Sequence, residues 1–445
     1  MNSAGAIGEV ERLLKGKGLD GYEIVYDWAR TLSIEVSEGK VESFRCAAPS
    51  GVAIRVLRGN GLGFSFSTSL APADLSRMVE GAIVGAEAQT PDPCHSFPLP
   101  GQYPSIPGMV DEALAAVPEE EKIARAVELE RLTLAADPRV SRVRKATYGE
   151  TYGGRHIRNS IGVDCAADST SVSGSVSAIA SDGADTQMGW DFSYGTRYSD
   201  VDVAAVAKGA AARATALLGA RKIGTMRCPA VLDRYVAGEV LDVLAPAFLA
   251  ENIQKGKSLL AGKLGSELFS RSLRIRDDGT LPEGMATFPF DGEGVPMQDT
   301  VVVEEGVVTS FLYDTLRGCR EGVPSTGNGV RDGIRSPLRM GVTNFFIENG
   351  TSSVRDLLSG AGRGVLVTEV MGMHTANPVS GEFSVGASGF YIENGEVVHP
   401  VREIVITGSI LDIFRDVLMV GNDLRFFGTV ASPSLLVGAL DVSGH

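Results

Sequence analysis

The segment from Ala230 to Leu260 has the apolar spacing of an active-site helix but lacks the residues that would carry out the chemistry. A zinc protease helix needs two histidines one turn apart, with a glutamate beside the first as general base. This segment contains no histidine. Its apolar residues recur at helical spacing, which predicts a helix with one face in a core; they are Val236, Val240, Val243, Leu244 and Phe248. We therefore expect no metal on this helix.

His374 has the most suggestive surroundings of any histidine in the chain. It lies in the segment from Glu369 to Phe383, which mixes glycines with polar side chains and has little strand periodicity. Such a segment suits a loop that lines a cavity, and equally a surface loop held by the turn chemistry of Asn377. We take His374, Asn377 and Glu382 as candidate peptide contacts. No histidine lies within one helical turn of another, so no helix carries a ligand pair.

A basic loop runs from Arg331 to Arg339. Its guanidinium groups suit a carboxylate or the C-terminus of a peptide, so Arg331 and Arg335 are further candidate peptide contacts. The alternative is a solvated loop that offsets an acidic protein.

Composition limits the classes of function. The chain has 445 residues, 44% of them hydrophobic, and a formal net charge of −14. This acidity argues against nucleic acid as a partner, because phosphate binding needs a clustered basic face. The N-terminus lacks the features of a signal peptide and no stretch is apolar enough to span a bilayer, so we expect a cytoplasmic protein without membrane contact. The scattered cysteines form no CxxC pair and are expected as free thiols; they are Cys46, Cys94, Cys165, Cys228 and Cys319.

The sequence predicts an α+β protein with a repeated N-terminal half. Residues 1–90 and 112–222 each read as helix, antiparallel sheet and helix, with a proline-rich linker over 91–111. Phe64-Ser65-Phe66 matches Phe192-Ser193-Tyr194 at an offset of 128 residues. Residues 228–445 hold many short strands between glycine turns, which predicts a β-rich domain with a mixed sheet or a barrel-like body.

Short motifs along the C-terminal half carry a family resemblance. They are Leu232–Glu239, Gly256–Leu260 with Lys263–Gly265, Arg276–Gly279, Phe290–Val295, Glu304–Val307, Asn377–Gly386, Ile392–Gly395, Pro400–Arg402 and Val420–Leu424. Together they resemble the TldD/PmbA family, once described as modulators of DNA gyrase. The resemblance covers essentially the whole chain, and the block from Thr375 to Phe427 is its most specific part.

The resemblance implies two related subunits around an internal chamber that degrades unfolded peptides. One subunit, TldD, is implied to carry zinc on a His-Glu-xxx-His helix with a later cysteine, and the other, TldE or PmbA, to lack it. Here the motif positions are Asp233, Arg234 and Gly238, and Gly428–Ser434 contains no cysteine. Arginine cannot act as a general base at ordinary pH, and glycine has no side chain to ligate. The resemblance therefore implies the zinc-free TldE/PmbA branch, with no cofactor of its own.

Three hypotheses about function follow. The leading one is a non-catalytic subunit that holds unfolded peptides for a zinc-bearing, TldD-like homologue. The second is a stand-alone non-metal peptidase in which His374 works with Glu369 or Glu382. The third is a protein that binds DNA gyrase directly. Without its homologue, the chain is expected to form a homodimer through an apolar surface of its C-terminal domain.

Overall fold

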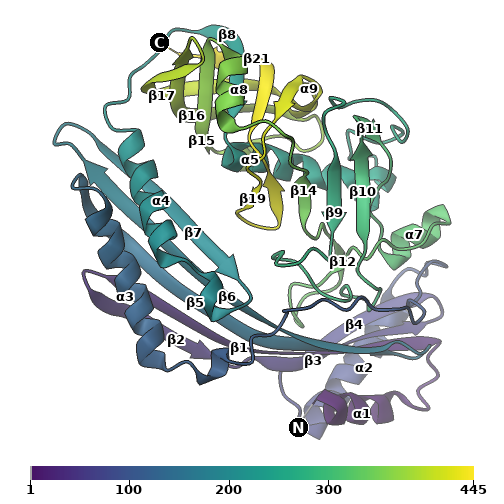
Figure 1. Ribbon diagram of the computed structural model, residues 1–445. Helices are drawn as coiled ribbons and strands as arrows, with labels where there is room; N and C mark the ends of the chain where they lie inside the picture. Colours follow the sequence, from purple (N-terminus) through teal and green to yellow (C-terminus); the bar gives the residue numbers. More distant parts are fainter. Residues whose placement is uncertain (1–2, 445) are drawn as a thin grey trace.

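A long curved N-terminal sheet lies beneath a C-terminal body in the computed structural model, which describes residues 3–444 (Figure 1). The N-terminal half contains two units of helix, strands and helix. The first comprises α1 (Ser3–Leu14), β1 (Gly21–Ser37), β2 (Lys40–Ala47), β3 (Ser50–Arg58), β4 (Gly61–Ser67) and α2 (Pro72–Ala88). The second, after the short helix η1 (Leu114–Ala116), comprises α3 (Glu119–Ala136), β5 (Val140–Asn159), β6 (Asp164–Ser181), β7 (Thr186–Gly195), η2 (Tyr198–Asp200) and α4 (Val203–Ala216).

The two units share one antiparallel sheet of seven strands, in the order β4-β3-β1-β5-β6-β7 with β2 paired to β1. β1 and β5 form the seam, from Glu23 opposite Asn159 to Val36 opposite Ala146. Strand order is the same on both sides of this seam, apart from the extra strand β2. β1 is one continuous strand because β5 pairs with it without a break from Glu23 to Val36.

Glycine contacts confirm that the two units are similar. A Cβ added to Gly61 would lie 2.0 Å from the backbone oxygen of Ala86, and one added to Gly189 would lie 2.2 Å from the backbone nitrogen of Ala214. Gly189 and Ala214 each lie 128 positions after Gly61 and Ala86, as the sequence predicts. In both units, therefore, a helix packs on an outer strand so closely that only glycine fits there.

Side chains along β1 point alternately to the two faces of the sheet, and their contacts show what covers each face. Ile24 packs against α1 and α2, and Ile34 packs against α3 and α4, so the helices cover one face. Val25 points the other way and joins Phe290 of the C-terminal body in an apolar cluster. Because successive side chains of a strand point to opposite faces, one strand contributes to the cores on both sides.

Buried charges join the sheet to the body. Glu23 accepts hydrogen bonds from Arg55 (Nε to Oε1, 3.0 Å) and from Arg331, and Arg55 also donates to Glu293 at 3.2 Å. Their exposed fractions are 0% for Glu23, 5% for Arg55, 6% for Arg331 and 1% for Glu293. Since a buried charge is tolerated only when it is paired, these four residues fix how the body sits on the sheet.

The C-terminal body contains a closed five-stranded barrel, in the order β17-β16-β15-β8-β21, closed where β21 pairs with β17. This confirms the predicted β-rich, barrel-like domain. A second sheet has the order β11-β10-β9-β14-β20-β19. The strands are β8 (Met226–Leu232), β9 (Ile275–Asp278), β10 (Asp299–Glu304), β11 (Val307–Val308), β12 (Gly329–Val330), β13 (Arg339–Met340), β14 (Phe345–Ile347), β15 (Gly364–Met371), β16 (Glu382–Glu393), β17 (Glu396–Ser409), β18 (Val417–Val420), β19 (Arg425–Phe426), β20 (Val430–Ser432) and β21 (Leu435–Ser443).

The helix expected from residue 230 begins later. Ala230–Leu232 belongs to β8, which pairs with β15 and β21, and Asp233 caps the helix that follows. Pro246 then diverts the chain into a 3-10 turn. The helices of the body are α5 (Arg234–Leu244), η3 (Ala245–Phe248), α6 (Ala250–Gln254), α7 (Thr315–Glu321), α8 (Val354–Ala361), η4 (Met373–Thr375) and α9 (Ile410–Arg415). Within residues 3–444, no helix is long and apolar enough to cross a membrane.

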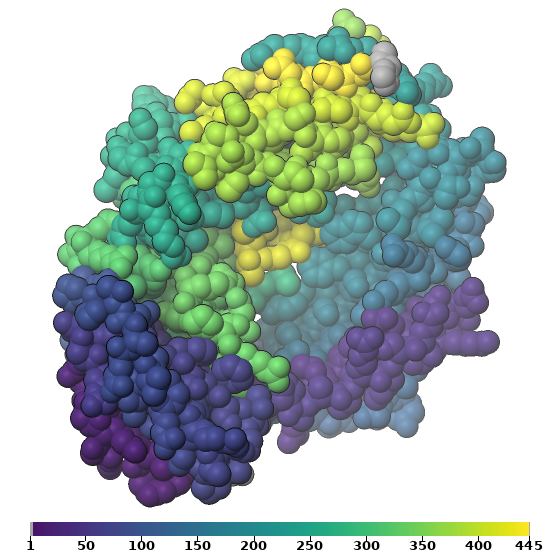
Figure 2. Space-filling view, turned by 180° about the vertical axis from the view of Figure 1, so that it is seen from behind, coloured from purple at the N-terminus to yellow at the C-terminus, as the bar shows by residue number. Residues whose placement is uncertain are grey.

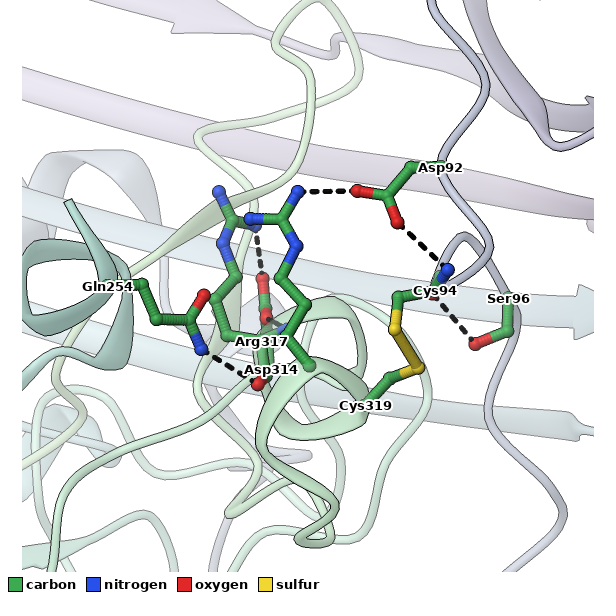
Figure 3. The surroundings of a disulfide bond; sticks show 8 residues. Asp92, Cys94, Ser96, Gln254, Asp314, Arg317 and Cys319 are labelled. Carbon is green, nitrogen blue, oxygen red and sulfur yellow. Dashed lines mark hydrogen bonds and ion pairs between the residues drawn. A yellow bond between two sulfur atoms is a disulfide. The ribbon is translucent and has the colours of Figure 1, made fainter.

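A disulfide corrects the prediction of five free thiols. Cys94, in the proline-rich linker over 91–111, is bonded to Cys319 on α7, 225 positions away (Figure 3). Asp92 accepts from Arg320 beside it, and Tyr103 of the same linker donates to the carbonyl of Gly294. The linker is thus tied to the body as well as to the sheet. The pairing was missed because it brings together residues that no local sequence pattern connects.

Replacing Glu23 with glutamine leaves two buried arginines without their shared anion. We expect Glu23→Gln to lower the free energy of unfolding by about 3–5 kcal/mol, measured by urea denaturation. Glu304→Gln, which breaks an exposed pair with Arg274, is the control and should cost about 1 kcal/mol or less. Equal losses in both variants would contradict the network.

The disulfide closes a long loop of the unfolded chain. Cys94→Ser should therefore lower the free energy of unfolding by about 2–5 kcal/mol under oxidising conditions. Cys46→Ser, at an exposed free cysteine, should leave the denaturation midpoint unchanged. If the two variants share the wild-type midpoint, the linker does not hold the fold through this bond.

Candidate functional site

The space between the sheet and the C-terminal body is the candidate site. Three cavities of about 810, 390 and 310 Å³ lie there. The first shares Ser169, Met285 and Thr287 with the second and Thr429 with the third, so the three adjoin one another. Figure 2 shows this region as a hollow bordered by the purple N-terminal strands and by the green and yellow C-terminal residues.

The smallest cavity lies along α5, at the degenerate motif positions. A Cβ added to Gly238 would lie 3.8 Å from the backbone nitrogen of Ser432, so α5 packs against β20. The fold thereby brings together the two segments that the resemblance implies for a metal centre, although they are almost 200 residues apart in the sequence.

The motif residues themselves have structural roles. Asp233 caps α5 by accepting from the backbone nitrogen of Tyr235 at 2.9 Å, and its burial raises the pKa of its carboxyl. The backbone nitrogen of Arg234 donates to Ser434 Oγ, and its guanidinium donates to the carbonyl of Asp423. Among residues 3–444, no three His, Cys, Asp or Glu side chains converge as metal ligands. These residues do not fit the catalytic zinc of the metal-bearing branch.

Aromatic and acidic side chains line this cavity. The guanidinium of Arg213 lies 5.4–5.7 Å from the ring centroids of Trp190, Tyr235 and Phe427. Glu239 and Asp242 are also lining residues, and burial raises the pKa of both carboxyls. The sequence analysis missed these acidic residues. Their spacing from Tyr235, at i+4 and i+7 on α5, places all three on one helix face and is the signal that could have found them.

The three candidate contacts around residue 374 lie outside the lining of the cavities. His374 is exposed on η4, near enough to Glu239 to oppose the burial that raises the pKa of that carboxyl. Asn377 Oδ1 accepts from the backbone nitrogens of Val379 and Ser380, which is the turn chemistry considered for this loop. Glu382 is exposed at the start of β16. Only His374 therefore lies close to α5.

Arg331 and Arg335 line the largest of the three cavities, that of about 810 Å³. Arg331 is buried, and this burial lowers the pKa of its guanidinium, whereas Arg335 is exposed. Asp291, also in the lining, has its pKa raised to about 8, first by burial and then by the charge of Glu293. The structure thus brings the two predicted arginines together in one cavity and separates them from the loop around His374.

Comparisons with known proteins agree along the whole chain. Models of PmbA/TldA metallopeptidase domain 1, central domain and C-terminal domain match residues 22–86, 112–218 and 225–444. Metalloprotease PmbA of Escherichia coli O157:H7 is 28% identical over 454 residues, covering 99% of this chain and 96% of that protein. A PmbA homolog of Haemophilus influenzae is 27% identical, covering 93% of this chain and 90% of that protein.

Solved structures share the fold. A candidate modulator of a DNA gyrase from Thermotoga maritima has a TM-score of 0.91 and 30% identity, covering 99% of this chain and 100% of that one. TldE from Thermococcus kodakarensis has a TM-score of 0.90 at 24% identity, covering 98% and 100%, and supports the fold alone. On these matches, the chain belongs to the TldD/PmbA family.

Proposed function

We propose that this chain is the zinc-free subunit of a TldD/TldE-type peptidase complex. It forms part of a chamber that holds unfolded peptides for cleavage by a zinc-bearing homologue. The observation that carries the proposal is the motif site on α5, which faces a cavity but holds Asp233, Arg234 and Gly238 where ligands are required.

The hollow between sheet and body supports a role in holding peptides. Its adjoining cavities mix aromatic, acidic and basic side chains, and concave sites with a few polar groups are where ligands bind. The name metalloprotease belongs to the relatives that carry it. For this chain we keep the non-catalytic role, in the cytoplasm as the sequence predicts.

An apolar surface on the C-terminal body supports association with the homologue. Val397 and Val398, adjacent at the start of β17, are exposed by 43% and 53%. Met371 and Val405, which both pair with Gly386 of β16, are exposed by 60% and 37%. Neighbouring exposed apolar side chains are typical of protein contacts. We assign this surface to the homologous subunit and, in its absence, to a second copy of the chain.

The complex is tested by adding this chain to the purified zinc-bearing homologue and an unfolded peptide. We expect faster cleavage than with the homologue alone, and loss of this gain in Val398→Glu because a buried charge disrupts an apolar interface. Val84→Glu, at an exposed valine of α2, is the control and should behave as wild type. Equal cleavage with and without this chain would refute the proposal. Cleavage by this chain alone, lost in His374→Ala, would favour the stand-alone peptidase.

The zinc-free assignment makes a separate prediction. After dialysis, elemental analysis should find far less than one zinc per chain, because Arg234 and Gly238 cannot ligate a metal. A chelator should leave the thermal midpoint of the chain unchanged, since no folding energy comes from metal. Zinc near one equivalent per chain would show that other residues form a site.

A further inference from the structure

The largest cavity holds more positive charge than its own residues neutralise. Four arginines line it: Arg155, Arg331, Arg335 and Arg339. Arg155 donates to both carboxylate oxygens of Asp27 at 2.8 and 3.1 Å. In the same way, Arg339 donates to both oxygens of Asp332 at 2.6 and 2.7 Å.

The remaining two arginines are not compensated in this way. Arg331 shares Glu23 with Arg55, so one carboxylate serves two guanidinium groups, assisted by Glu293 at Arg55. Arg335 has no acidic partner among the described residues. The chain has a formal net charge of −14, so acidic side chains outnumber basic ones. An arginine that lines a cavity without an acidic partner is therefore unexpected.

Asp291 does not neutralise Arg335. Its carboxylate accepts from three backbone nitrogens, those of Glu293, Val295 and Gly329, which occupies both oxygens. Burial also raises the pKa of this carboxyl. The lining has a positive balance in any case, because four arginines face three aspartates, Asp27, Asp291 and Asp332.

One buried polar atom in the lining, Nη1 of Arg331, lacks a hydrogen-bond partner. Buried polar groups without partners are rare in native structures, so each calls for an explanation. This atom can only donate a hydrogen bond, so the missing group is an acceptor.

The loop that carries Arg335 is held at both sides. Arg331 Nε donates to the carbonyl of Gly292 at 2.6 Å. Ile334 packs on β3, where a Cβ added to Gly51 would lie 2.2 Å from Ile334 Cδ1. Because its neighbours are anchored, the backbone of Arg335 is positioned before a ligand arrives, which reduces the entropy lost on binding.

Apolar side chains also line the cavity, namely those of Trp28, Phe288, Phe290 and Val342. The volume of about 810 Å³ is that of a site for a small molecule or a few residues of a peptide. A carboxylate beside an apolar side chain matches this lining, because guanidinium groups bind carboxylates in a bidentate manner.

We propose that this cavity binds a peptide carboxylate through Arg335 and the unpartnered Nη1 of Arg331, with the neighbouring apolar side chain against Trp28 and Phe288. The carboxylate comes from the C-terminus of the peptide or from an Asp or Glu side chain. This inference rests on the proposed function, since it names the end or side chain by which a held peptide is recognised.

The test measures binding of three short fluorescent peptides by anisotropy. One ends in phenylalanine with a free carboxylate and contains no Asp or Glu. The second is the same peptide with an amidated C-terminus, and the third is amidated but has a glutamate beside the phenylalanine. We expect the free carboxylate to tighten binding by about tenfold or more over the amide.

Variants assign the effect to the cavity. In Arg335→Gln the difference between free and amidated peptide should disappear, while Arg221→Gln, at an exposed arginine outside the three cavities, should retain it. Circular dichroism checks that both variants fold. Tight binding of the third peptide, lost in Arg335→Gln, supports a carboxylate site that takes acidic side chains.

Two outcomes would overturn the inference. Equal affinity for all three peptides would remove the carboxylate site but leave the peptide chamber standing. Binding of none of them, alone or with the zinc-bearing homologue present, would remove the chamber as well. A preference for the free carboxylate that survives in Arg335→Gln would place the recognition elsewhere in the chain.

Discussion

The contact between Glu23, Arg55, Glu293 and Arg331 holds the two halves of this protein in one arrangement. Each of these charges is buried, and each is tolerable only because a partner from another part of the chain is present. Apolar burial, as between Val25 and Phe290, favours association of sheet and body but does not select one relative orientation. The ion pairs select that orientation, because their hydrogen bonds form in only one register of sheet and body.

That register creates the cavities. The helices cover one face of the curved sheet (Figure 1), so its other face is free to meet the body, and the cavities lie between the two, in the hollow that Figure 2 shows. The linker crosses beside this space, tied to α7 by the Cys94–Cys319 bond. Beside these cavities, α5 lies where the resemblance implies the zinc helix, and its motif residues serve as cap and packing contacts. The proposed role in binding without catalysis rests on this combination.

Much of this protein is determined by local sequence. Pro72 at the start of α2 and the acidic residues after Pro118 at the start of α3 are typical of helix N-termini, and the structure has a helix at each place. The 128-residue repeat is visible because glycine and alanine must recur where a helix approaches a strand closely. The missing histidines of α5 are also visible in the sequence alone, since ligand chemistry depends on residue type.

Only the tertiary structure decided which distant residues meet. Glu23 and Arg331 are 308 positions apart, and Cys94 and Cys319 are 225 positions apart, so no periodicity or motif links them. The end of β8, Ala230–Leu232, falls within the segment that the sequence predicts as helix, because a short apolar run suits either state until its neighbours, β15 and β21, are known. The sequence identified Arg335 as a basic loop residue. Its position in a cavity that apolar side chains also line, without an acidic partner among residues 3–444, arises from the packing of sheet against body, and this packing makes it a candidate for binding.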